Sequence, residues 1–243
     1  MNHPAKIETL VTTVGATSGF PVFSADARNV YFTSNKNGPY DIFVKAVDGS
    51  SDEREFFKFD KGRLGAVFLT ASPDGKYLAF QTVDPVTKKE DVDLLSLVGD
   101  HTPRPFLHSL VDHGTPAFSP DGKWLAYESL QGGRREVYIT PFPAGGAEYE
   151  VSTNGGERPV WRRDGKEIFY RENLRLMAVA VKAKGDTFEL GAPNALFEVA
   201  ARNLNGRWYD VGPDGRLLMN TAPIVSQAQN FELLVNWPAE LNK

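Results

Sequence analysis

Residues 115–129 read Thr-Pro-Ala-Phe-Ser-Pro-Asp-Gly-Lys-Trp-Leu-Ala-Tyr-Glu-Ser. This stretch predicts a short strand, a Pro-Asp-Gly turn and a second strand whose residues alternate between two faces from Trp124 onward. Proline sets φ for the turn, aspartate bonds its own backbone, and glycine accepts a positive φ. A turn of this kind between two β-type runs favours a hairpin.

The same unit recurs in four other places, and each copy is centred on a turn aspartate. The five aspartates lie about 43 to 50 residues apart at Asp26, Asp74, Asp121, Asp164 and Asp214. A period of this length that consists of strands and turns is typical of β-propeller blades. A third and a fourth strand are expected after each of the first four hairpins, so each of these repeats is predicted to be a four-stranded meander.

We therefore predict an all-β fold, a β-propeller of five four-stranded blades in one domain over residues 1–243. The expected blades cover residues 14–60, 61–109, 110–154, 155–201 and 202–238. The last repeat is one strand short, and the strand at residues 6–13 is expected to complete it beside residues 231–237, which removes two exposed sheet edges. The alternative is that the repeats are part of a six-bladed or larger ring.

The expected blade core consists of large apolar side chains on the first three strands of each repeat. Packing of neighbouring blades face to face would bury them. They are Phe23, Phe32, Phe43, Phe80, Phe118, Tyr127, Tyr138, Trp161, Phe169 and Leu218.

The composition of the chain argues against several kinds of partner and site. The formal net charge of −4 over 243 residues provides no basic surface, so nucleic acid is not an expected partner. There is no cysteine, which excludes disulfides and thiolate metal sites. No apolar run approaches the ~18 residues of a membrane span, and the first residues lack the apolar core of a signal peptide. As written, the chain is predicted to be cytoplasmic, or to be an excised domain that lost its targeting segment.

Several motifs carry a resemblance to a known family. They include Arg104-Pro105-Phe106-Leu107, the Phe118–Trp124 stretch, residues 136–143 and 151–157, and the closing Asn236-Trp237-Pro238. The chain resembles TolB-like and WD-like β-propeller repeats from about residue 20 to its end, and is similar above all to the C-terminal propeller region of bacterial, acidobacterial-type serine/threonine protein kinases. The resemblance implies an extracytoplasmic sensing or scaffolding domain of a membrane-anchored parent. The motifs of a kinase domain itself are absent from the sequence.

The loops that enter the innermost strands are expected to converge at one mouth of the central channel, where propellers usually bind ligands. Aligning the repeats places the entry residues at 18–20, 66–68, 113–115, 156–158 and 206–208. The candidate binding residues at or next to these positions are His113, Glu157, Arg158, Arg207, Trp208, Tyr209 and Asp210.

Three of these residues could hold a metal ion. Imidazole and carboxylates suit Zn²⁺, Mn²⁺ or Ca²⁺, so His113, Glu157 and Asp210 are candidate ligands of a divalent metal. Such a metal could activate water, with Arg158 holding an anionic group of the substrate. The alternative interpretation is that these residues are solvated and form ordinary ion pairs at the rim.

Two functions from different classes follow. The first is a ligand- or protein-binding module, a sensor or scaffold, with a small molecule, a peptide or a protein at the channel mouth. The second is a metal-dependent hydrolase of an ester, a lactone or a phosphotriester. No Gly-x-Ser-x-Gly motif or other strong catalytic signature is present, which favours the binding module. The ligand and the oligomeric state stay open.

Overall fold

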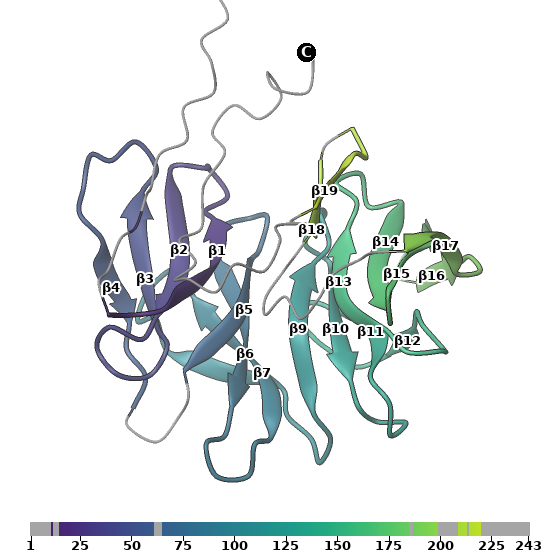
Figure 1. Cartoon of the computed structure of the whole chain (residues 1–243), viewed down its shortest axis with the longest axis horizontal. Coiled ribbons are helices and arrows are strands. Elements are labelled where there is room, and N and C mark those ends of the chain that lie inside the picture. The colour runs from purple at the N-terminus through teal and green to yellow at the C-terminus, as the bar shows by residue number, and fades with distance from the viewer. Residues whose placement is uncertain are drawn as a thin grey trace, which may run out of the picture.

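The computed structural model describes residues 11, 15–60, 65–184, 187–198, 209–212 and 214–219. Every helix or strand assigned in this part of the chain is a β-strand, and hairpins join consecutive strands into antiparallel sheets (Figure 1). The all-β prediction is confirmed. No helix among these residues is long and apolar enough to cross a membrane.

Each of the first three repeats forms one four-stranded sheet, as predicted. The first sheet contains β1 (Ser18–Phe23), β2 (Asn29–Ser34), β3 (Asp41–Ala46) and β4 (Arg54–Phe57). The second contains β5 (Ala66–Ala71), β6 (Tyr77–Val83), β7 (Glu90–Ser96) and β8 (Pro103–Leu107). The third contains β9 (His113–Phe118), β10 (Trp124–Ser129), β11 (Glu136–Pro141) and β12 (Tyr149–Glu150).

The fourth repeat contains one strand more than we predicted. Its sheet is built from β13 (Glu157–Trp161), β14 (Glu167–Glu172), β15 (Arg175–Lys184) and β17 (Asn194–Glu198). The long strand β15 also pairs, over its last residues, with β16 (Thr187–Leu190). The outer strand of this repeat is therefore divided in two, and a hairpin extends beyond the sheet.

The fifth repeat is described only as the hairpin of β18 (Tyr209–Val211) and β19 (Leu217–Met219). The innermost strands contact one another in chain order, β1 to β5, β5 to β9, β9 to β13 and β13 to β18, as neighbouring blades of a propeller do. Residues 6–13, except Val11, and residues 231–237, on which the predicted ring closure rests, lie outside the described residues. The number of blades and their exact bounds therefore stay predictions.

The turn aspartates of the first three repeats lie in the turns that the sequence predicts. In the first three repeats a serine hydroxyl two residues earlier donates to the aspartate at 2.6 Å, in the pairs Ser24–Asp26, Ser72–Asp74 and Ser119–Asp121. The aspartate also accepts from the amide two residues later. Repeat one lacks the turn glycine, and Ala27 takes its place with a φ of 56°. The hairpin of repeat one thus forms with an alanine in the left-handed conformation, which alanine rarely adopts.

Most of the residues that were predicted to form the blade core are buried. Eight of the ten are buried, including Phe32, Phe80 and Tyr127, which are completely buried. Phe23 and Leu218 were wrong, because they are 44% and 54% exposed.

Strand alternation explains both errors. Val22 packs into the cluster shared with the second repeat, so its neighbour Phe23 points to the opposite face of β1. On β19, Leu217 and Met219 pack against the fourth repeat, and Leu218 between them points away from it. The two exposed side chains therefore lie on the faces opposite to these packed clusters.

Candidate functional site

The four fully described innermost strands share one backbone irregularity near their beginning. Each strand slips in register against its partner, between Gly19 and Val22 in β1 and at the equivalent places in β5, β9 and β13. The residue inside each bulge has a positive φ of 43° to 58°, and these residues are Phe20, Phe68, Thr115 and Arg158. We call these four residues the entry ring. Bulges of this kind redirect a side chain and are common next to functional sites.

The redirected side chains meet although they belong to different repeats. The ring centroids of Phe20 and Phe68 are 4.7 Å apart. The guanidinium carbon of Arg158 lies 5.0 Å from the centroid of the Phe68 ring. A cation at this distance from an aromatic face is attracted by the ring quadrupole. Residues of the first, second and fourth repeats thus form one continuous aromatic and cationic surface.

Side chains of the preceding blade hold two bulges in place. The amide of Thr115 donates to the side-chain oxygen of Gln81 at 3.1 Å. The amide of Arg158 donates to Oε1 of Glu128 at 2.5 Å, and the hydroxyl of Thr115 donates to the same oxygen. Gln81 and Glu128 occupy the same position on the second strand of consecutive repeats. Each therefore connects its own blade to the bulge of the next one.

Glu128 carries a carboxylate at a buried position. Burial raises its pKa, because the charged form loses its hydration there. Its Oε2 lies 3.4 Å from Nη1 of Arg135, whose Nη2 pairs with Glu90 at 2.6 Å. The carboxylate is thus surrounded by donors, and an ion pair continues from it to the second blade.

Arg158 is held from both sides. The hydroxyl of Tyr209, on the fifth repeat, donates to the Arg158 carbonyl at 2.7 Å. Burial lowers the pKa of the Arg158 guanidinium, with a smaller contribution from the nearby cation of Arg171. Arg171 itself pairs with Glu157, its cross-strand neighbour. Arg158, Tyr209 and Glu157, three of the predicted binding residues, are therefore gathered around the beginning of β13.

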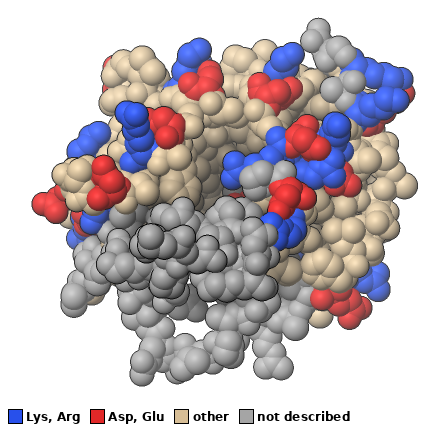
Figure 2. Space-filling model, turned by 90° about the horizontal axis from the view of Figure 1, so that it is seen from above, with Lys and Arg blue, Asp and Glu red and all other residues tan. Residues whose placement is uncertain are grey.

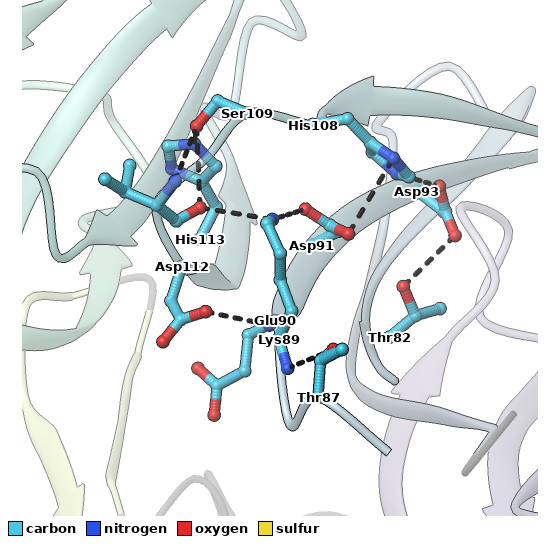
Figure 3. Close-up of polar contacts among 11 residues, drawn as sticks. Thr82, Thr87, Lys89, Glu90, Asp91, Asp93, His108, Ser109, Asp112 and His113 are labelled. Atoms are coloured by element: carbon cyan, nitrogen blue, oxygen red, sulfur yellow. Dashed lines mark hydrogen bonds and ion pairs between the residues drawn. The ribbon is translucent and has the colours of Figure 1, made fainter. Parts of the chain in front are cut away.

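His113, the first residue of β9, belongs to a separate network beside the loop that joins β8 to β9 (Figure 3). Its ring is 4% exposed, and Nε2 shares a hydrogen bond of 2.8 Å with Oγ of Ser109. The ring stands edge-on to Tyr127, with centroids 5.7 Å apart. Burial lowers the pKa of His113, and the ammonium of Lys89 adds to the effect. His113 is therefore a neutral, packed side chain near physiological pH.

The neighbouring part of this network contains Asp93, a buried carboxylate on β7. Figure 3 shows His108 directed at it, with Nε2 2.7 Å from Oδ1. The hydroxyl of Thr82 donates to the other oxygen at 3.2 Å. Asp91, on the same strand, pairs with Lys89, which directly precedes β7. This buried carboxylate therefore has hydrogen-bond partners on both of its oxygens and connects the outer strand β8 to the blade.

The proposed metal ligands do not come together. Asp210 is exposed on β18 and accepts a hydrogen bond from the next amide, while Glu157 pairs with Arg171 and His113 with Ser109. Throughout the described part of the chain, no group of three His, Asp or Glu side chains could hold a metal ion. Arg207 and Trp208 lie outside the described residues.

Of the four residues of the entry ring, only Arg158 was among the predicted binding residues. Phe20, Phe68 and Thr115 were placed at the entry positions but were not selected. Gln81 and Glu128 were not considered. The sequence does contain a signal for the bulges. Phe20, Thr115 and Arg158 each lie six residues before the turn aspartate of their repeat, and each is followed by a proline. Proline removes a ladder donor and is confined to irregular positions within sheets, so the repeated Pro marks a bulge.

Seen from above, the molecule is hollowed at its centre, and acidic and basic side chains alternate around the hollow (Figure 2). Charges of both signs thus lie along the described part of the rim.

The fold is that of TolB-like β-propellers. A TolB of Acinetobacter baumannii superimposes with a TM-score of 0.62 at 19% identity, over 82% of this chain and 47% of that one. An oligogalacturonate lyase of Vibrio parahaemolyticus gives a TM-score of 0.61 at 14% identity, over 92% of this chain and 64% of that one. A puromycin-hydrolyzing peptidase of Mycobacterium tuberculosis gives a TM-score of 0.59 at 18% identity, over 90% of this chain and 36% of that one.

These similarities establish the fold alone, because they lie at low identity and the chain spans only about half to two thirds of the first two proteins. No protein-family model matches the chain, and no curated protein matches it. The resemblance to the kinase propeller region stays a prediction. The comparisons identify the chain as similar in fold to TolB-like β-propellers.

Proposed function

We propose that the chain is a binding module whose site is the entry ring. The ligand lays an apolar group against Phe20 and Phe68 and brings a carboxylate or another hydrogen-bond acceptor to Arg158. A small molecule or the end of a peptide has this chemistry. The observation that carries the proposal is the meeting of these three side chains from three different repeats.

Two further features support this choice. Left-handed residues that are not glycine cost about 1 kcal/mol or more each and persist where the surrounding structure holds them. Four repeats keep such a residue at the same position, and two of the four are fixed by side chains of the preceding blade. In addition, apolar surface with a few directed polar groups is the usual composition of a ligand site.

The proposal does not extend to metal-dependent hydrolysis. The three residues predicted to bind the metal each have other partners or lie exposed, and no other described group replaces them. The structural relatives include enzymes, but a shared propeller fold does not transfer their chemistry.

A titration with N-acetylphenylalanine, followed by the amide signals of isotopically labelled protein, tests the proposal. The probe combines an aromatic ring with a carboxylate. We expect saturable shifts at the amides of Phe20, Phe68, Thr115 and Arg158. Its amide analogue, which lacks the charge, is expected to bind more weakly because Arg158 then loses a charge-assisted hydrogen bond.

Two variants locate the site. Phe68→Asn removes the ring while asparagine tolerates a positive φ, so the bulge is preserved. Arg158→Gln removes the cation and leaves the amide bond to Glu128 intact. Each is expected to weaken binding by about tenfold, whereas Arg175→Gln, an exposed arginine on β15, is expected to leave it unchanged. Unchanged binding in both test variants, or shifts confined to other blades, would contradict the proposal.

A further inference from the structure

One groove of the molecule is formed by the part of repeat four that the other repeats lack. Strand β15 spans ten residues, whereas the third strands of the first three repeats span six or seven. The added length pairs with β16 from Val181–Leu190 to Lys184–Thr187. Insertions into single repeats of repeat proteins commonly lie on the binding face. The surface that the extension covers is therefore a candidate binding surface.

The extension brings Phe188 onto the interface between repeats three and four. Its ring centroid is 4.0 Å from that of Trp124 and 6.3 Å from that of Trp161. These rings form the floor of a groove of about 610 Å³, which is open to solvent along one side and passes between the turns of the two blades. The indole of Trp161 also donates to the Ala117 carbonyl at 3.1 Å, so the floor is fixed in orientation.

Three cations line this groove, namely Arg163, Lys166 and Lys182. Lys182 is 75% exposed, and the nearest acidic oxygen to its ammonium, on Glu189, is 4.0 Å away. Arg163 and Lys166 are likewise exposed on the turn of repeat four. An exposed pair at 4 Å contributes little, so these charges remain available to a partner.

The two acids of the groove are occupied by their own turns. Asp164 receives two hydrogen bonds of 2.7 Å from Arg162, which hold its pKa down at about 2. Asp121 accepts from the Ser119 hydroxyl at 2.6 Å and from the Lys123 amide. Both carboxylates therefore accept hydrogen bonds within their own turns. The groove combines an apolar floor with a rim that carries the three cations.

We propose that this groove docks an acidic peptide segment of a partner protein. One apolar side chain of the segment packs on Phe188 between the tryptophans, and acidic residues on either side of it face Arg163, Lys166 and Lys182. Opposite charge at the rim and an apolar anchor at the centre are the usual division of roles in an interface. The site is independent of the entry ring, since no residue of the ring lines it.

The test uses a fluorescently labelled synthetic peptide in which a leucine–phenylalanine pair is flanked on both sides by glutamates. A second peptide has glutamine in place of every glutamate. We expect saturable binding of the acidic peptide in fluorescence anisotropy, and weakening as salt is raised. The Lys166→Gln/Lys182→Gln double variant is expected to bind at least about tenfold more weakly.

Lys76→Gln is the matched control, because Lys76 follows the turn glycine of repeat two as Lys166 follows that of repeat four, and repeat two has no extension. It is expected to bind the acidic peptide as the unmodified protein does. Phe188→Ser, checked for folding by its thermal transition, is expected to weaken both peptides by removing the anchor contact.

Four results would overturn the proposal. They are no saturable binding up to about 1 mM peptide, equal binding of the glutamine peptide, an equal loss in Lys76→Gln, and unchanged binding in the double variant. Perturbation of the groove by N-acetylphenylalanine but not by the acidic peptide would also count against it, since the groove would then accept a small molecule.

Discussion

The two halves of the entry ring have the same backbone but different side chains. Phe20 and Phe68, on the first two repeats, are apolar and contact each other. Thr115 and Arg158, on the next two, are polar, and side chains of the preceding blades accept their amide hydrogens. The bulge is thus a property of the repeat, whereas the chemistry at its tip varies from blade to blade. A propeller can therefore change its ligand without changing its strands.

The polar half itself contains two versions of one contact. Gln81 holds Thr115 with a neutral amide, and Glu128 holds Arg158 with a buried carboxylate. Substitutions at these connecting side chains and beside the bulges test whether the polar half depends on them and whether the two versions are equivalent.

Glu128→Ala is expected to have the largest effect. It leaves the Arg158 amide and the Thr115 hydroxyl without their acceptor and removes one partner of Arg135. We expect the free energy of unfolding to fall by about 3 kcal/mol. Gln81→Ala, which removes one neutral acceptor, should cost about 1–2 kcal/mol. Thermal or urea unfolding measures both, and equal losses would remove the distinction between the two contacts.

Gly114→Ala comes next and compares the halves directly. A Cβ at Gly114 would lie 2.4 Å from the Gln81 side-chain oxygen, so Gln81 must leave the Thr115 amide. We expect a loss of about 2 kcal/mol in unfolding experiments. Gly19→Ala is the control at the same position of the apolar half, where a Cβ would meet nothing within 4 Å. A similar loss for both substitutions would show that the space beside the bulge is unimportant.

Glu128→Gln replaces the charged version of the contact with the neutral one. Because burial raises the folded-state pKa of Glu128, its contribution to stability is present at low pH and is lost as pH rises through that pKa. The glutamine variant does not titrate. As pH rises from acidic to neutral, the free energy of unfolding of the variant should therefore rise relative to that of the unmodified protein, by on the order of 1 kcal/mol. A stability difference that does not change with pH would argue against the raised pKa.

His113→Gln is expected to have the smallest effect. Burial lowers the folded-state pKa of His113 below 6.5, so its contribution is present above that pH and is lost as pH falls from 6.5 toward the folded pKa. Glutamine can keep a bond to Ser109 but does not titrate. The variant should lose less stability than the unmodified protein between about pH 7 and about pH 5.5, by roughly 0.5 kcal/mol. Parallel melting curves at the two pH values measure the difference.

Much of the fold could be predicted because it rests on local chemistry. The Ser-x-Asp turns form from hydrogen bonds between residues two apart, and they recur with the repeat. The site was only partly predictable. The alignment located the entry positions, but Phe20, Phe68 and Arg158 became a site only through contacts between repeats. The same limitation explains the wrong assignment of Phe23 and Leu218, whose exposure depends on which blade covers each face.

The sequence by itself determined the repeat, its hairpins and the all-β class, since turn geometry and strand alternation depend on neighbours along the chain. The tertiary structure alone decided which side chains meet at the bulges. It also decided that Glu128 is buried beside Arg135, that His113 is a packed neutral ring, and that Phe188 reaches Trp124 of repeat three. Burial, pKa and contact are properties of residues brought together from distant parts of the chain, and no local pattern contains them.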